Sequence, residues 1–313
     1  GTGYFGCRNA KGGFDAERFS EQAGKDVVKM IEVKLSQGAK PGHGGLLPAA
    51  KVTPEIADIR NVPMGEDVLS PPSHPEFSTP VGLLEFVQRL RKLSGGKSVG
   101  FKLCIGNKAE FLAICKAMME TGITPDFITV DGGEGGTGAA PVEFSNSVGM
   151  PLRDGLVFVQ NALIGCGLRD SMKIIASGKV LSAFHLVRLL ALGADTVSSA
   201  RAMMFALGCI QARLCNQNTC PTGITTQDPA RYKALDVERK GERVAQYHAS
   251  TIENLVDLVS ATGLNKIEEL QPHHIFHRIE GTEVKNYAQL YPGISDRCLL
   301  SESTCPPRWQ SDW

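Results

Sequence analysis

The chain has 313 residues, 42% hydrophobic and 21% charged, which is ordinary for a soluble globular protein. Lysine plus arginine equals aspartate plus glutamate at 33 each, so charge gives no reason to expect nucleic acid or an anionic membrane as partner. There is no signal-peptide pattern and no apolar run near the roughly 20 residues that span a bilayer, while nine cysteines argue against a disulfide scaffold and for a reducing compartment.

We therefore expect a cytoplasmic location for this chain. The sequence begins at Gly1 without a methionine, and we expect an upstream segment. Such a segment could carry a membrane anchor, so the prediction of location applies only to the residues given.

The first predicted elements are short. A polar, glycine-rich start with a helical turn near residues 16–22 precedes an apolar strand at residues 29–35. Residues 38–48 are too rich in glycine and proline for regular structure. Thr53-Pro54-Glu55 then predicts the start of a helix that reaches Arg60, because the three residues supply an N-cap, a first-turn proline and an acidic first turn. A brief strand follows at residues 67–70.

From residue 79 onward, strands and helices alternate regularly. The predicted strands are at residues 99–104, 127–131, 173–177 and 196–200, and the predicted helices at 79–93, 108–121, 156–164 and 183–192. This alternation predicts parallel βαβ units. Its repetition favours an α/β fold of the (β/α)8 TIM barrel type over an open doubly wound sheet. Polar and glycine-rich stretches follow the strands, where such barrels place their functional sites.

Six predicted strands leave two of a barrel's eight to be placed, and we expect these upstream of Gly1. In this interpretation residues 1–235 form the barrel, and residues 236–313 form a C-terminal helix followed by a surface tail from residue 272. The helix is predicted at residues 237–262, with an apolar stripe formed by Val244, His248, Ile252, Leu255 and Val259.

Three cysteines, Cys209, Cys215 and Cys220, lie within the run GCIQARLCNQNTCPTG. Thiolates are soft ligands that suit iron–sulfur clusters, zinc or copper(I). Three thiolates are one short of the four that structural zinc or a cubane cluster normally takes. The alternative is three unrelated buried thiols, because free cysteine packs well as a small hydrophobe.

The longer run GCIQARLCNQNTCPTGITTQ resembles the segment of the glutamate synthase flavin domain that holds a 3Fe-4S cluster. Three other segments resemble signatures of the same family in the same order: KLSQGAKPG at residues 34–42, SPP at 70–72 and GGTG at 135–138. The resemblance covers residues 26–262 and is closest to stand-alone members that lack the amidotransferase domain. It implies an FMN-dependent oxidoreductase barrel whose upstream segment supplies a strand that packs against the flavin.

Two late loops predict a phosphate site. Glycine and cations follow two successive strands, in Ser177, Gly178 and Lys179 and in Ala200 and Arg201, and such loops often bind phosphate in barrels. Within the resemblance, this implies the phosphate of FMN.

Lys102 lies inside an otherwise apolar strand, where a lysine is costly unless it faces a site or a partner. The resemblance implies that it lies near the pyrimidine end of the flavin and stabilises the charge of the reduced form. The alternative is a lysine at the end of a strand that reaches solvent.

A glycine-rich loop follows the strand at residues 127–131. Glycines let a backbone approach a ligand closely, and the resemblance places this loop beside the flavin, with contacts from Asp131, Gly132, Gly133, Gly135 and Gly136. Glu134 could act as an acid or could hydrogen-bond to a backbone amide. Glutamate synthases usually have His-Asp where this chain has Gly133-Glu134, which weakens the transfer of substrate contacts to this loop.

Four residues are candidates for substrate binding: Lys34, Gln37, Lys40 and Arg60. A dicarboxylic 2-oxo acid presents two carboxylates, which match planar arginine and charged lysine side chains. The resemblance implies that these residues face 2-oxoglutarate over the flavin. For any one of them, the alternative is a solvated loop charge.

The resemblance implies a glutamate synthase-like enzyme. Electrons from a donor such as ferredoxin or a reductase subunit pass through the 3Fe-4S cluster to FMN, which reduces the 2-imino acid of 2-oxoglutarate and ammonia to L-glutamate. Because the chain has no amidotransferase module, the nitrogen must come as free ammonia, from an ammonia-supplying subunit or as a methylated amine. The alternatives are an enzyme that forms N-methylglutamate and a non-catalytic electron-relay protein.

Overall fold

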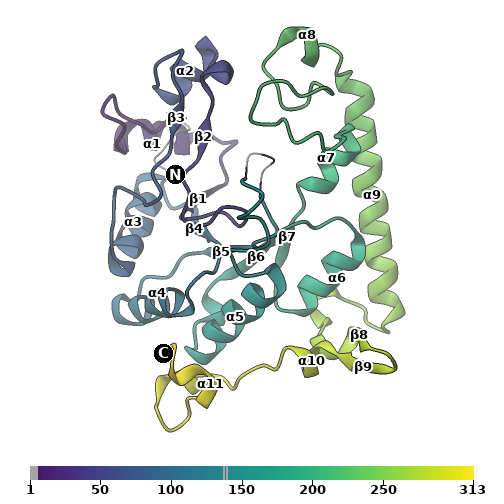
Figure 1. The fold of residues 1–313 in the computed structure, drawn as a ribbon. Helices are drawn as coiled ribbons and strands as arrows, with labels where there is room; N and C mark the ends of the chain where they lie inside the picture. The colour runs from purple at the N-terminus through teal and green to yellow at the C-terminus, as the bar shows by residue number, and fades with distance from the viewer. Residues whose placement is uncertain (1–5, 137, 139) are drawn as a thin grey trace.

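The computed structural model describes residues 6–136, 138 and 140–313, and its central feature is a five-stranded parallel sheet (Figure 1). The strands are β1 (Met30–Lys34), β4 (Ser98–Leu103), β5 (Phe127–Asp131), β6 (Lys173–Ser177) and β7 (Thr196–Ser198). They lie in chain order, β1-β4-β5-β6-β7, and each neighbouring pair is parallel. The predicted α/β class with a parallel sheet is confirmed.

Four helices lie in the chain between successive strands of this sheet. They are α3 (Pro80–Leu93), α4 (Lys108–Thr121), α5 (Leu152–Gly165) and α6 (Ala183–Ala191). Strands in chain order joined by right-handed crossovers place their connecting helices on one face of the sheet. Figure 1 shows these helices in an arc around the strands, from α3 through α4 and α5 to α6. The order is that of a barrel wall, but β1 and β7 remain the edges of the sheet among the described residues, so a closed barrel is not confirmed.

Local signals explain where these helices begin and end. The Thr79 hydroxyl accepts a hydrogen bond from the Gly82 N–H, and the Asn107 side chain accepts one from Ala109. Such caps satisfy backbone donors that the first helical turn leaves without a partner. At its other end, α4 terminates at Gly122, whose φ of 65° is in the left-handed region that glycine adopts without strain.

The prediction that residues 67–70 form a barrel strand is wrong. β3 (Val68–Leu69) pairs antiparallel with β2 (Leu46–Leu47) in a separate two-stranded sheet. This sheet, the short η1 (Ala49–Lys51) and α2 (Pro54–Arg60) enclose a small apolar cluster around Val52 and Val68. We call residues 46–69 the N-terminal lobe. A two-residue strand carries no pattern that reveals which partner it pairs with.

The C-terminal helix α9 (Val237–Ala261) packs against α6 and α7 (Arg201–Leu207). The predicted apolar stripe is wrong in part: Leu255 and Val259 are buried, Val244 is half-buried, and His248 and Ile252 are exposed. α6 and α7 have nine and seven residues and α9 has 25, so they cover only part of its length.

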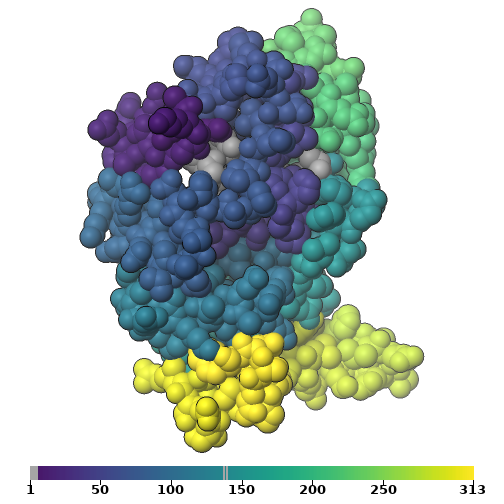
Figure 2. Space-filling model, turned by 60° about the vertical axis from the view of Figure 1, so that its left-hand side comes forward, coloured from purple at the N-terminus to yellow at the C-terminus, as the bar shows by residue number. Residues whose placement is uncertain are grey.

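The interpretation of residues 272–313 as a surface tail is also wrong in part. The hairpin of β8 (Phe276–Glu280) and β9 (Glu283–Asn286) is largely exposed, but Tyr287, Leu299 and Trp309 are buried in the main core. Trp309 stacks on Phe158 of α5, with ring centroids 5.2 Å apart. Figure 2 shows this yellow segment lying across one end of the molecule. Its anchoring residues follow no helical or strand period, which is why the sequence pattern gave no signal.

The remaining elements are short and lie near the chain ends and in loops. They are α1 (Ala16–Gly24), α8 (Pro229–Tyr232), α10 (Tyr287–Leu290), α11 (Pro307–Gln310) and the 3₁₀ turns η2 (Arg169–Ser171), η3 (Ile267–Glu269), η4 (Pro272–His274) and η5 (Cys298–Leu300). None of the helices in the described part of the chain is both long and apolar enough to cross a membrane.

Candidate functional site

A cavity of about 640 Å³ lies at the carboxyl ends of β5, β6 and β7. Four segments contribute to its wall: the glycine-rich loop after β5, the residues after β6, the start of α7, and residues 209–225, which contain the cysteines. Predicted cofactor residues that line it are Asp131, Gly135, Gly136, Ser177, Gly178, Lys179, Ala200 and Arg201. Gly132 and Gly133 lie in the same loop but not on the wall, and Thr137 is outside the described residues.

Asp131 ties two of these segments together. Its buried carboxylate accepts a hydrogen bond from the Gly38 N–H at 2.7 Å and another from the Ser177 hydroxyl at 2.9 Å. Gly38 packs so closely that a Cβ there would lie 1.7 Å from the Gly132 carbonyl oxygen. Asp131 therefore holds the loop after β1 and the end of β6 in register with the glycine-rich loop.

The sequence left two roles open for Glu134, an acid or a hydrogen-bond partner of a backbone amide, and the structure shows the hydrogen bond. Its carboxylate oxygens accept hydrogen bonds from the Leu152 N–H at 2.9 and 3.1 Å. Leu152 is the first residue of α5, and a carboxylate at a helix N-terminus is stabilised by the free N–H groups there. Glu134 thus connects the glycine-rich loop to α5.

Lys34, Gln37 and Lys40 lie together beside this loop. The Lys34 ammonium donates a hydrogen bond to Gln37 Oε1 at 2.5 Å, and Gln37 and Lys40 are buried. Burial lowers the pKa of Lys34, and the charges of Lys102 and Lys40 lower it further, while Asp131 and Glu32 oppose the shift. Burial also lowers the pKa of Lys40. The arrangement concentrates positive charge next to the glycine-rich loop.

Lys102 pairs in register with Lys34 across β4 and β1, and it has a partner that the sequence did not reveal. Its ammonium lies 3.4 Å from Glu32 Oε1, and the other Glu32 oxygen accepts a hydrogen bond from the Thr129 hydroxyl at 2.7 Å. Period-2 alternation along β1 places Glu32 and Lys34 on one face of the sheet, which is the signal that could have found Glu32.

Arg60 lies in a different part of the chain from Lys34, Gln37 and Lys40. It ends α2 in the N-terminal lobe and does not line the 640 Å³ cavity. Lys34, Gln37, Lys40 and Lys102 are also absent from the wall of that cavity, but their neighbours Ala39 and Asp131 belong to it.

Lys179 and Arg201 place two cations on the cavity wall. Lys179 Nζ donates to Asn146 Oδ1 at 3.3 Å, and Arg201 Nη2 donates to the Gly136 carbonyl at 3.4 Å. Both contacts involve the loop between β5 and α5. The two cations, together with Gly178, form a part of the wall that is suited to an anionic group.

The three cysteines at 209, 215 and 220 are half-buried free thiols on this same wall, whereas the other six cysteines are buried. Cys215 contacts the glycine-rich loop, because a Cβ on Gly138 would lie 2.6 Å from its sulfur. Burial would raise the pKa of Cys220, but hydrogen bonds with Thr222 and Thr225 outweigh it and lower that pKa to about 6. A lowered pKa favours the thiolate, which is the form that binds metals. Within the described residues, no three His, Cys, Asp or Glu side chains are grouped closely enough for a single metal ion.

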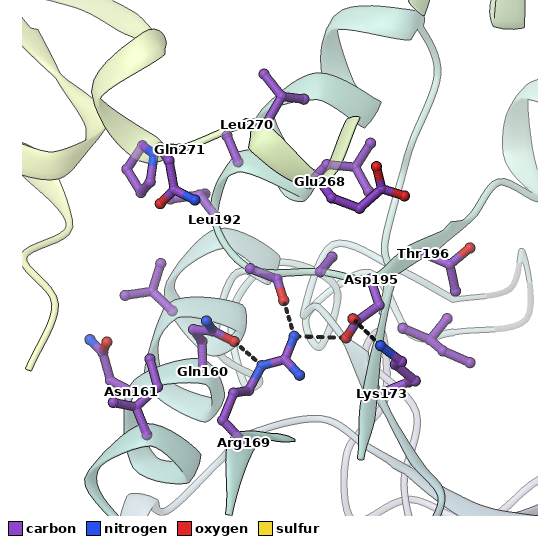
Figure 3. Close-up of a pocket in the computed structure, with 18 of the residues that line it drawn as sticks. Gln160, Asn161, Arg169, Lys173, Leu192, Asp195, Thr196, Glu268, Leu270 and Gln271 are labelled. Atoms are coloured by element: carbon purple, nitrogen blue, oxygen red, sulfur yellow. Dashed lines mark hydrogen bonds and ion pairs between the residues drawn. The ribbon is translucent and has the colours of Figure 1, made fainter. Parts of the chain in front are cut away.

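A second cavity, of about 790 Å³, lies at the opposite end of the strands (Figure 3). Its polar residues bond to one another: Arg169 donates to Asp195 at 2.7 Å and to Gln160 at 2.5 Å, and Lys173 pairs with Asp195 at 3.2 Å. None of the predicted site residues lies here. In barrels, the amino-terminal face serves stability and the carboxyl-terminal face carries function, so the smaller cavity is the candidate site.

Comparison with known proteins places the chain in a family. A family profile described as "Conserved region in glutamate synthase" matches residues 2–265. The chain is 44% identical over 290 residues to the glutamate synthase large subunit-like protein YerD of Bacillus subtilis, covering 93% of this chain and 55% of that protein. It is 38% identical over 242 residues to the archaeal glutamate synthase [NADPH] of Methanocaldococcus jannaschii, covering 77% of this chain and 47% of that protein.

Among solved structures, DHODH from Eimeria tenella has a TM-score of 0.42 and 10% identity over 82% of this chain and 57% of the other, a likeness too low to support an argument. The chain spans about half the length of the two curated relatives. The match to the family profile covers most of the chain, and the chain therefore belongs to the glutamate synthase family.

Proposed function

We propose that this chain is the FMN- and cluster-binding part of a glutamate synthase-like oxidoreductase that forms L-glutamate from 2-oxoglutarate and ammonia. The observation that carries the proposal is one cavity whose wall holds both eight of the predicted flavin residues and three half-buried free cysteines. Membership of the glutamate synthase family supports the same assignment. FMN would supply hydride transfer, and a 3Fe-4S cluster would supply one-electron transfer.

The residues of the cavity fit both groups. Lys179, Arg201 and the backbone at Gly178 would bind the phosphate of FMN, and the glycine-rich loop at residues 131–136 would lie against the flavin. Lys102 would stabilise negative charge on the reduced ring. Cys209, Cys215 and Cys220 would hold the cluster as thiolates. A cluster spaces its ligands more widely than a single ion does, so it does not need the tight grouping that a mononuclear site requires.

In the proposed enzyme, Lys34, Gln37 and Lys40 would bind and orient 2-oxoglutarate beside the flavin, with Arg60 as a further carboxylate ligand. The lysine ammonium groups would neutralise the two carboxylates. Because burial lowers the pKa of Lys34 and Lys40, each loses its proton more readily than a solvated lysine. Ferredoxin or a reductase subunit is the proposed class of electron donor, and a separate subunit could supply ammonia.

The direct test is anaerobic purification, followed by measurement of flavin, iron and sulfide. We expect FMN, and a cluster signal that disappears in Cys215→Ser. With dithionite as reductant, 2-oxoglutarate plus ammonia should give L-glutamate. Lys179→Met together with Arg201→Met should reduce FMN content, whereas Lys285→Met in the exposed β8–β9 hairpin should not. Turnover with methylamine alone would favour the N-methylglutamate activity, and cofactors without turnover would favour an electron relay.

A further inference from the structure

Two hydrogen bonds join the N-terminal lobe to the cysteine loop, residues 209–220. The Lys51 ammonium donates to the carbonyl oxygen of Cys215 at 2.6 Å, and the Asn218 amide donates to the Ala50 carbonyl at 3.1 Å. The joined segments are more than 160 residues apart in sequence. Neither Lys51 nor Asn218 has a role in the flavin or substrate binding proposed above. The contact between the two segments therefore needs a separate explanation.

The backbone turn that carries Lys51 is anchored within the N-terminal lobe. It is the last residue of η1, and the Ala49 N–H at the start of that turn donates to Asp67 Oδ1 at 2.8 Å. The Lys51 side chain is half-buried. Fixing a lysine costs side-chain entropy, and a backbone carbonyl as acceptor leaves its positive charge without a neutralising carboxylate at that contact.

Cys215 is thereby contacted from two directions. Gly138 of the glycine-rich loop lies against its sulfur, and Lys51 bonds to its carbonyl oxygen. The loop around it is conformationally restricted, because Gln211, Arg213 and Asn218 all have positive φ, at 57°, 58° and 61°. This region is uncommon for non-glycine residues, although asparagine adopts it more readily than most. The contact with Gly138 and the hydrogen bond from Lys51 are the two interactions that define the position of Cys215.

We propose that Lys51 is a positioning residue that fixes Cys215 and raises the reduction potential of the cluster which that cysteine binds. This inference rests on the proposed function. The potential of an iron–sulfur cluster depends on net charge, hydrogen bonding and solvent exposure around it. Reduction adds negative charge, and a cation fixed on the backbone of a ligand cysteine would stabilise the reduced state more than the oxidised state.

The test is a redox titration of the cluster, followed by electron paramagnetic resonance, in Lys51→Met, Lys51→Gln and Lys51→Arg. In the Met and Gln variants we expect the midpoint potential to fall by about a tenfold change in the one-electron equilibrium, roughly 59 mV. Arginine retains the charge, and that variant should stay near the wild-type potential. The midpoint potential of FMN should remain unchanged in all three.

Lys97→Met is a matched control. The Lys97 ammonium also donates to backbone carbonyls, but to those of Ala23 and Lys25, which lie outside the cysteine loop. We expect it to lower the free energy of unfolding without moving either potential. If Lys51→Met fails to assemble a cluster, the midpoint potential of the cluster in Lys51→Gln still tests the proposal.

An unchanged cluster potential in a Lys51→Gln protein that retains the cluster would overturn the inference and leave the proposed function standing. A shift equal to that of Lys97→Met would do the same, because it would reflect general destabilisation. A wild-type protein with no cluster signal would overturn the cluster assignment and the inference together. Those results are distinguishable from one another in the same titrations.

Discussion

At the scale of single residues, the carboxylates of Asp131 and Glu134 hold the glycine-rich loop to neighbouring segments of the chain. Asp131 and Glu134 were placed beside the flavin, and the structure shows both carboxylates bonded within the protein, Asp131 to Gly38 and Ser177 and Glu134 to Leu152. Gly38 and Asp131 are 93 positions apart in sequence. Such a contact depends on the packing of two loops, and no periodic pattern encodes it. The pairing of Lys102 with Glu32 was also missed, although the period-2 alternation of β1 could have indicated it.

The role of Asp131 leads to a prediction about stability. Asp131→Asn keeps the side-chain size but removes the charge and one acceptor oxygen, so both hydrogen bonds persist only if the Ser177 hydroxyl changes from donor to acceptor. We expect the free energy of unfolding to fall by about 1–3 kcal/mol, measured by urea denaturation. Asp296→Asn is the control, because that side chain is 72% exposed. Equal, small effects at the two positions would show that Asp131 does not tie the loops together.

At the scale of elements, local signals were sufficient where the determining residues are close in sequence. The N-caps Thr53 and Thr79 and the glycine stop at Gly122 fall at the observed helix ends, because a cap involves residues only two to four apart. The strand at residues 67–70 was assigned to the wrong sheet, because strand pairing is a non-local choice. The packing of the C-terminal segment on the core was not predicted, because it depends on isolated buried residues, Tyr287, Leu299 and Trp309, that follow no periodic pattern.

The hydrogen bonds of Asp195 with η2 and with the start of β6 predict a dependence of stability on pH. Burial would raise the pKa of Asp195, but hydrogen bonds from the Ile174 N–H, Arg169 and Lys173 outweigh it and lower that pKa. A lowered folded-state pKa contributes stability above the ordinary carboxyl value of about 3.9, and this is lost as pH falls through the still lower folded value.

Asp195→Asn should therefore unfold more easily at neutral pH, by about 1–3 kcal/mol. Its unfolding free energy should also decline less steeply than that of the wild type as pH falls below about 4. Urea denaturation of both proteins between neutral and acidic pH gives the comparison. Parallel curves over the whole range would contradict the network shown in Figure 3.

Two glycines in helices should respond in opposite directions to replacement by alanine. A Cβ on Gly165, the last residue of α5, would lie 2.6 Å from Leu299 and 2.7 Å from Ile294 of the C-terminal segment. Gly165→Ala should displace that segment and cost about 1–3 kcal/mol, as overpacking does. Gly241 in α9 has open space around it, and Gly241→Ala should gain about 0.5–1 kcal/mol.

Tryptophan fluorescence reports on the first change, because Trp309 and Trp313 are the chain's two tryptophans and Trp309 stacks on α5. A shifted emission spectrum in Gly165→Ala, with an unchanged one in Gly241→Ala, is the expected pattern. If Gly165→Ala left both stability and emission unaltered, close docking of the C-terminal segment on α5 would be wrong.

At the scale of the whole molecule, the five strands of the sheet lie close to the positions that the sequence predicts, and the 640 Å³ cavity lies at the carboxyl ends of three of them, on the side where the sequence predicts a functional site. Long alternating segments with clear breakers determine parallel βαβ units, and these make up most of residues 79–207. The same local signals cannot predict whether the sheet closes into a barrel. Closure depends on the pairing of edge strands that are far apart in the sequence. The convergence of the cysteine loop on the glycine-rich loop likewise depends on the path of the chain after β7, for which local propensity gives no guidance.

The placement of all nine cysteines gives a last prediction, about thiol accessibility. Cys209, Cys215 and Cys220 are half-buried, and the other six, Cys7, Cys104, Cys115, Cys166, Cys298 and Cys305, are buried. Reaction with a thiol reagent requires access and a thiolate, so a cluster-free native protein should show three rapidly reacting thiols and should show nine after unfolding in guanidinium. A variant with serine at the three loop positions should lose the rapid phase, and cluster-bound protein should show the same protection without mutation. More than three rapid thiols in the native protein would mean that the core does not bury the remaining cysteines as described, and rapid labelling of cluster-bound protein would remove these three as its ligands.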